Sequence, residues 1–93
     1  MRDNILKNPT HCPAVLVHGW RSHPGIWDRL ISRLSGVGVP FWNFDHTSMQ
    51  GAGTEAIANA LQNFIRERRR ETGYIGPVDL VCHSMGACIA RYL

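Results

Sequence analysis

The feature that most constrains the fold of this chain is an alternation of short apolar runs with segments of helical periodicity. The apolar runs cover residues 14–17, 41–44 and 78–81, within expected strands over residues 14–18, 41–45 and 78–82. The first run is apolar at successive positions, which is typical of a parallel strand that is buried on both faces. Strands that alternate with helices favour βαβ units and a parallel sheet. The sequence therefore predicts an α/β fold: a three-layer α/β/α arrangement around a short parallel sheet of about three strands.

Two segments between these runs carry an apolar stripe at helical spacing. The first helix is expected to begin after Ser22 or Pro24, and its stripe consists of Ile26, Trp27, Leu30, Ile31 and Leu34. The second is expected to have Thr54 as its N-cap and to end at Gly73 in the left-handed conformation. Its stripe consists of Ile57, Leu61, Phe64 and Ile65. A third helix is expected to begin near Ser84.

The order of the strands follows from the handedness of their connections. Right-handed crossovers that place helices on both faces of the sheet put the first strand between the second and the third. The crevice of such a doubly wound sheet lies at the carboxyl ends of the first and third strands. These ends carry residues 18–20 (HGW) and 82–86 (CHSMG). We therefore expect the two motifs to meet at one edge of the sheet.

The second motif places a serine between a strand and a helix. Cys82 and Gly86 lie two positions to either side of Ser84. Small residues at these positions allow a sharp, strained turn that pushes the serine hydroxyl outward. Backbone N–H groups at the start of the helix can then hold an oxyanion. The sequence predicts a strained backbone conformation at Ser84.

Residues 81–86 (VCHSMG) resemble the nucleophile elbow of the α/β-hydrolases, in the lipase and esterase branch, with Cys82 in place of the first glycine of G-x-S-x-G. Residues 13–20 (PAVLVHGW) resemble the oxyanion strand and His-Gly turn of the same family. Trp27 and Asp45 match residues that are common at these places in the family. The resemblance covers about residues 13–93 and implies a partial α/β-hydrolase fold.

The resemblance also implies roles for individual residues. Ser84 would be the nucleophile, and the backbone N–H groups of Trp20 and Met85 would form the oxyanion hole. The elbow and the facing loop would be shaped by His18, Gly19, Cys82, His83 and Gly86. The His83 side chain is expected to point away from the serine hydroxyl. The implied substrate is an acyl ester or lipid, and neither a metal nor a cofactor is expected.

The other two members of a catalytic triad are not found. In this family the nucleophilic Ser comes first in the chain, followed by an Asp or Glu and then by a His. Residues 85–93, which follow Ser84, contain no Asp, Glu or His. We therefore expect a single, incomplete α/β-hydrolase domain over residues 1–93, with residues 1–12 as an N-terminal extension. The expected function is a serine ester hydrolase whose 93-residue chain alone is weakly active or inactive.

Two alternatives remain open at this stage. One is an acyltransferase of the same fold, and the other is a non-catalytic truncated or split subunit that needs a partner. An incomplete sheet would leave the backbone groups of the third strand unpaired, and exposed strand edges recruit partners. We therefore expect self-association, or a need for a missing C-terminal half.

The remaining histidines have alternative interpretations. His46 could form a local dyad with Ser84, but a solvated loop histidine is the favoured interpretation. His11 and His23 are expected at the surface. No pair of histidines has the helical spacing of a zinc site.

Charge and composition exclude several classes. The net charge of +3 is only mildly basic, and glutamates interrupt the arginines of residues 66–71, so nucleic-acid binding is not expected. Even the longest apolar stretches, such as residues 14–17, are far too short to span a membrane, and no signal peptide is recognised. Three cysteines without metal-site spacing fit a reducing cytoplasm. Cys82 and Cys88 are expected to pack as small apolar residues rather than to form a disulfide.

Overall fold

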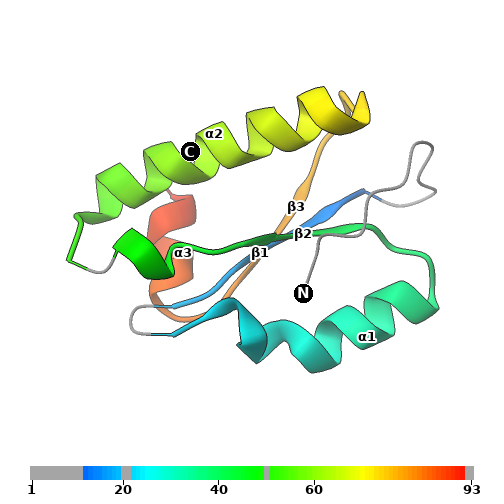
Figure 1. Cartoon of the computed structure of the whole chain (residues 1–93), viewed down its shortest axis with the longest axis horizontal. Coiled ribbons are helices and arrows are strands. Elements are labelled where there is room, and N and C mark those ends of the chain that lie inside the picture. Colours follow the sequence, from blue (N-terminus) through cyan, green and yellow to red (C-terminus); the bar gives the residue numbers. More distant parts are fainter. Residues whose placement is uncertain (1–11, 20–21, 50, 92–93) are drawn as a thin grey trace.

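The strands form one parallel sheet with the predicted order. The computed structural model describes residues 12–19, 22–49 and 51–91. Strands β1 (Ala14–Val17), β2 (Phe41–Phe44) and β3 (Asp79–Cys82) are hydrogen-bonded in the order β2-β1-β3 (Figure 1). Both pairs are parallel. The prediction that β1 lies between the other two strands is confirmed.

The three strands end level with one another. Val17, the last residue of β1, is paired with Phe44 of β2 on one side and with Cys82 of β3 on the other. The residues that follow each strand therefore leave the sheet at the same edge. This register brings the loops after β1, β2 and β3 together.

Helices cover both faces of the sheet, so the predicted three-layer α/β/α arrangement is confirmed (Figure 1). Helix α1 (Asp28–Gly36) lies on one face, preceded by the 3-10 turn η1 (Pro24–Trp27). Helices α2 (Thr54–Thr72) and α3 (Met85–Ala90) lie on the other. A second 3-10 turn, η2 (Thr47–Met49), follows β2.

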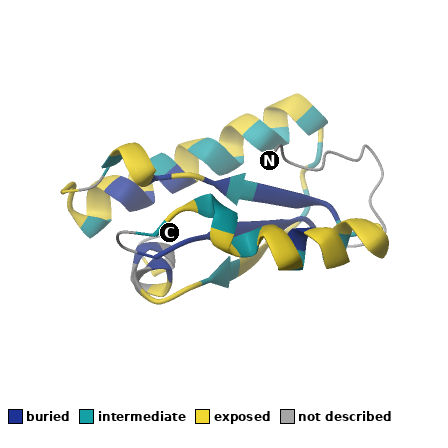
Figure 2. Ribbon diagram, turned by 60° about the horizontal axis from the view of Figure 1, so that its bottom comes forward, coloured by how far each residue is buried: buried dark blue, intermediate teal, exposed yellow. Residues whose placement is uncertain are grey.

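The core has two parts, because successive side chains of a strand point to opposite faces. The buried residues on the α2 and α3 side are Val15, Val17, Trp42, Phe44, Ile57, Ala58, Leu61 and Ile89. Those on the α1 side are Ala14, Leu16, Ile31 and Phe41. Figure 2 shows this burial along the strands and on the helix surfaces that face them. Burial of β1 on both faces explains its continuous apolar run.

Two details of the predicted helices are wrong. Ile26 is 40% exposed, because it lies in the 3-10 turn η1, whose tighter period turns it away from the stripe that α1 buries. Thr54 is the first residue of α2, and the N-cap is Gly53, without a side-chain cap hydrogen bond. The prediction that the helix ends at Gly73 in the left-handed conformation is confirmed, since Gly73 is the C-cap and has a φ of 75°.

Strand β3 is an edge of the sheet and is less buried than β1. Asp79 is exposed, and 39% of Leu80 is accessible to solvent. The self-association expected from this edge stays a prediction. None of the helices among the described residues is long and apolar enough to cross a bilayer. The expected N-terminal extension, residues 1–12, lies outside the described residues except for Cys12.

Candidate active site

The loops after β1 and β3 are in direct contact at the carboxyl edge of the sheet. The backbone N–H of His83 donates to the Val17 carbonyl at 3.0 Å, which continues the pairing of β1 with β3. A Cβ atom on Gly19 would lie 3.0 Å from the His83 carbonyl oxygen and 3.2 Å from Ser84 Cβ. A side chain on Gly19 would be crowded here, so the two loops approach closely because this residue has none. The predicted meeting of the two motifs is confirmed.

Ser84 has the strained backbone that the sequence predicts. Its φ is 55° and its ψ is −120°, and among the described residues it is the only one other than glycine with a positive φ. Such a conformation costs about 1–3 kcal/mol and persists only where the surroundings impose it. Helix α3 begins at the next residue, and Ser84 is exposed. The turn therefore presents the serine to solvent at the start of a helix.

Gly86 explains why this turn is sharp. A Cβ atom on Gly86 would lie 2.5 Å from the Val17 carbonyl oxygen and 3.3 Å from that of His18. Both contacts are with backbone, which cannot move aside without disturbing β1. The absence of a side chain at Gly86 thus lets α3 start directly over the end of the central strand.

Cys82, the other small residue of the turn, is partly buried and packs against the core on the α2 and α3 side. Burial raises the pKa of its thiol, so the uncharged form is favoured. The prediction that Cys82 packs as a small apolar residue is confirmed, and its thiol is free. The Cys88 side chain lies outside the described part of the structure.

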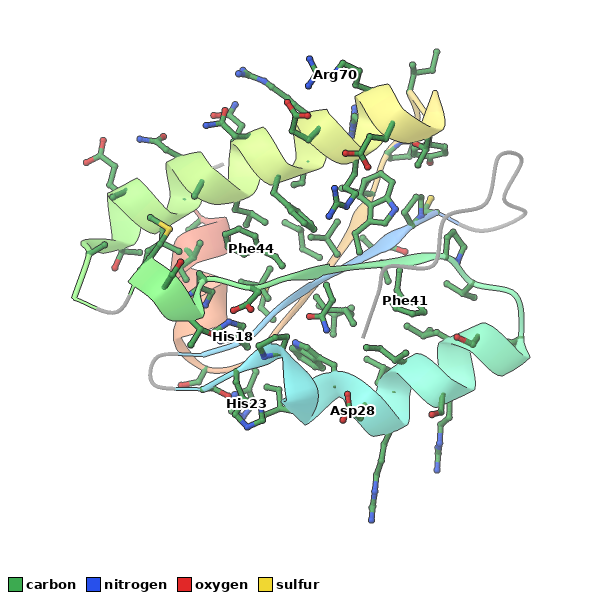
Figure 3. The ribbon with its side chains drawn as sticks, in the orientation of Figure 1. His18, His23, Asp28, Phe41, Phe44 and Arg70 are labelled. Atoms are coloured by element: carbon green, nitrogen blue, oxygen red, sulfur yellow. The ribbon has the colours of Figure 1, made fainter. Side chains whose placement is uncertain are left out.

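His18 is fully buried at the end of β1 (Figure 3). Its Nε2 accepts a hydrogen bond from the His46 backbone N–H at 3.1 Å. Because Nε2 is an acceptor, the ring proton is assigned to Nδ1, which donates to the Gly19 carbonyl oxygen at 3.0 Å. Burial lowers the pKa of His18, and the adjacent His46 lowers it further, against the opposing influence of Gly19 and Asp45.

His46 is not the solvated loop residue that was expected. Only 2% of it is exposed, because the level strand ends place it against the buried His18. The two imidazole rings stack with centroids 3.8 Å apart and planes 6° apart. His46 Nε2 lies 2.7 Å from the His18 carbonyl oxygen. Since a carbonyl only accepts, Nε2 carries a proton and donates it there, so this nitrogen is not placed to take a proton from Ser84.

Asp45 lies beside this pair and is exposed. Its Oδ1 accepts hydrogen bonds from the hydroxyl and the backbone N–H of Thr47, the latter at 2.9 Å. These bonds lower the pKa of Asp45. The same oxygen lies 3.7 Å from His18 Nε2. Asp45 therefore both accepts from the first residue of η2 and places a carboxylate next to the buried histidine.

The structure places the other predicted residues as follows. Trp27 packs against the core on the α1 side, which gives it a structural role. His23 is exposed, as predicted, and His83 is exposed, with its Nδ1 3.3 Å from where a Cβ on Gly19 would lie. The backbone of Met85 starts α3. The remaining ones, Trp20 and His11, lie outside the described residues.

Sequence reasoning missed the pairing of His18 with His46. The only signal for it was position, since each residue follows closely on the end of a predicted strand. Within the described part of the chain, no group of three His, Cys, Asp or Glu side chains is arranged to hold a metal ion. These residues place an exposed serine in a strained turn. Next to it lies a glycine turn that is hydrogen-bonded to two buried histidines.

The lowered pKa of His18 predicts a pH dependence of stability. The unfolded chain takes up a proton on His18 near the ordinary pKa of 6.5, whereas the folded chain resists it. The contribution of His18 to the free energy of unfolding is therefore fully present above pH 6.5, and it is lost as the pH falls from there toward the lower pKa of the folded state. The slope is at most about 1.4 kcal/mol per pH unit. Urea unfolding at pH 7.5, 6.5 and 5.5 measures it.

His18→Asn is expected to flatten this slope, because asparagine does not titrate yet keeps an N–H close to the position of Nδ1. His23→Asn is the matched control, since it removes an exposed histidine. An unchanged slope in His18→Asn would contradict the assignment.

Comparison with known proteins agrees with this geometry. The sequence model of the alpha/beta hydrolase family matches residues 14–92. Searches of curated proteins and of solved structures gave no match. The family match covers every strand and helix described above, including the turns at Gly19 and Ser84. This chain belongs to the alpha/beta hydrolase family.

Proposed function

We propose that this protein is a serine hydrolase of carboxylic esters, of the lipase or esterase kind, in which Ser84 is the nucleophile. The observation that carries the proposal is the backbone of Ser84, with φ of 55° at the tip of a strand-turn-helix unit. Strain of this kind is concentrated at functional sites. Membership of the alpha/beta hydrolase family supports a hydrolase-type fold around it.

The proposed chemistry is acyl transfer through a covalent intermediate. The Ser84 Oγ attacks the carbonyl carbon of the ester and gives up its proton to a base. The tetrahedral oxyanion collapses, the alcohol leaves with a proton, and an acyl-serine remains. Water then attacks the acyl carbon, which releases the carboxylic acid and restores the serine. In this scheme the acyl ester is the only substrate besides water.

The proposed oxyanion donors are the backbone N–H groups of Met85 and Trp20. Met85 is the first residue of α3, and the first N–H groups of a helix have no carbonyl partner within it. Gly19, which precedes Trp20, lies against Ser84. Donors fixed in this way would hold the negative charge as it develops.

The proposed base and acid lie outside these 93 residues. No Asp, Glu or His follows Ser84 in residues 85–93, and Nε2 of the nearby His46 already donates to a carbonyl. A longer chain or a second subunit would supply them. The 93-residue chain alone is therefore expected to hydrolyse esters weakly or not at all.

The test is covalent labelling of Ser84 with a fluorophosphonate, which a reactive serine attacks as it would an ester. Added imidazole replaces the missing base, so labelling is expected to become faster as its concentration rises. Intact and peptide mass spectrometry would locate the adduct. Ser84→Ala is expected to abolish labelling, and Ser35→Ala, at an exposed serine of α1, is expected to leave it unchanged. A chain whose Ser84 stays unlabelled at every imidazole concentration would contradict the proposed function.

A further inference from the structure

The loops that follow β1 and β2 are joined by a reciprocal pair of hydrogen bonds between two histidines 28 residues apart. The His46 backbone N–H donates to the His18 ring, and the His46 ring donates to the His18 backbone. The rings stack in parallel, and both residues are at most 2% exposed. Buried hydrogen bonds of this kind hold the two residues in place, because breaking one leaves an unsatisfied polar group in the core.

The first bond decides which tautomer His18 adopts. Since His46 N–H points at Nε2, a neutral His18 ring must carry its proton on Nδ1. That proton is the one donated to the Gly19 carbonyl oxygen. With the other tautomer, two N–H groups would face each other at Nε2 and the Gly19 carbonyl would lose its donor. The loop after β2 therefore controls a bond made by the loop after β1.

The two imidazole N–H groups hold two successive carbonyls of the glycine turn. His46 Nε2 holds the His18 carbonyl, and His18 Nδ1 holds the Gly19 carbonyl. A trans peptide group is planar, so a carbonyl held in place also fixes the direction of the N–H in the same group. The group that begins with the His18 carbonyl contains the N–H of Gly19, which packs against Ser84.

We propose that His46 is a positioning residue of the Ser84 site, which holds the His18-Gly19 turn against the serine through its reciprocal hydrogen bonds with His18. This inference rests on the proposed function for its effect on chemistry, although the positioning itself can be measured separately. The charged or titratable neighbours of the pair are Asp45, whose Oδ1 is 3.7 Å from His18 Nε2, and His83, whose Nδ1 faces Gly19. Neither replaces the bond from His46 Nε2 to the His18 carbonyl.

The first measurement is the protonation of the ring nitrogens in the full chain at pH 7.5, by ¹⁵N NMR of the histidine side chains. His18 is expected as the tautomer with the proton on Nδ1, and His46 is expected to carry a proton on Nε2. A His18 ring with its proton on Nε2 would overturn the inference, whatever Ser84 does.

The second measurement uses two variants that separate the effect of the stacked ring from the effect of the Nε2–H donor. His46→Phe keeps a stacking ring and removes the Nε2–H, whereas His46→Gln removes the ring and keeps a side-chain N–H at a similar reach. The backbone amide signals of Gly19 and Ser84 are expected to shift in His46→Phe and to return toward their original positions in His46→Gln. Unshifted signals in His46→Phe would overturn the inference.

The third measurement is the rate of fluorophosphonate labelling with imidazole present. It is expected to fall about tenfold in His46→Phe, the effect of losing one hydrogen bond that orients the site, and to recover in His46→Gln. Ile31→Val, in the core on the α1 side, controls for a general loss of stability and should keep the original rate. An equal fall in Ile31→Val and His46→Phe would show a merely structural role.

The two proposals can fail separately. An unlabelled Ser84 in the unaltered chain would reject the proposed function, and the tautomer and the amide signals would still decide whether His46 holds the turn. A labelled Ser84 whose rate is the same in His46→Phe would reject the positioning role and leave the proposed function standing.

Discussion

Gly86→Ala is expected to lower the free energy of unfolding by about 2 kcal/mol or more, although alanine is the better helix former. Inside a helix, alanine is favoured over glycine by about 0.5–1 kcal/mol. At Gly86, however, the new Cβ would lie 2.5 Å from the Val17 carbonyl oxygen, and forcing extra atoms into a packed site costs about 1–3 kcal/mol. The contact is with backbone of the central strand, so relief requires α3 to move away from β1.

Gly36→Ala is the matched control, because nothing lies within 4 Å of a Cβ at this helical position. It is expected to leave the protein as stable or slightly more stable. Thermal unfolding followed by circular dichroism measures both variants, and a loss of about 2 kcal/mol corresponds to a fall of roughly 8–16 °C in Tm for a domain of this size. Equal Tm values for the two variants would show that α3 does not need this close approach. Labelling of Ser84 should fall with Gly86→Ala, since the turn moves with the helix.

Trp42→Ala is expected to lower the free energy of unfolding by about 3–5 kcal/mol, the usual cost of removing a large aromatic side chain from a core. Trp42 is only 1% exposed and belongs to the core on the α2 and α3 side. Its ring meets Tyr74 edge to face, with centroids 6.4 Å apart. The total stability of a small domain is about 5–15 kcal/mol, so this single change would remove a large part of it.

Two variants bracket this result. Trp42→Phe keeps an aromatic ring in the core and should recover much of the loss. Ile75→Ala removes an apolar side chain that is 90% exposed and is expected to change stability by less than about 0.5 kcal/mol. Urea unfolding at pH 7.5 gives all three values. A cost at Trp42 as small as that at Ile75 would contradict the packing described for the α2 and α3 side.

Local pattern predicted most of the fold, because the features that encode it are short-range. A continuous apolar run identifies a strand buried on both faces, as at residues 14–17. The handedness of βαβ connections then places this strand in the centre of the sheet. The strained backbone at Ser84 was also predictable, since it depends on the small residues Cys82 and Gly86 two positions away.

Periodicity was less informative where the helical period changes. Ile26 fits the apolar stripe of an α-helix, but the chain at this point is a 3-10 turn, and the side chain is exposed. Thr54 has the chemistry of an N-cap, yet Gly53 occupies that position. Both differences concern element ends, where one residue more or less changes which side chain faces the core.

The layers, the strand order and the turn at Ser84 can all be predicted from short stretches of sequence, whereas the environment of the histidines depends on contacts that form only in the folded protein. His46 carries no local mark of burial, and its neighbours Asp45 and Thr47 are exposed. It is buried because β1 and β2 end level, which brings its ring onto His18. The tautomer of His18 depends on the hydrogen bond from His46, and the pKa of His18 is lowered mainly by burial and further by the adjacent His46. Contacts between residues distant in sequence exist only after the chain has folded, and the polarity of a histidine's surroundings is set by those contacts.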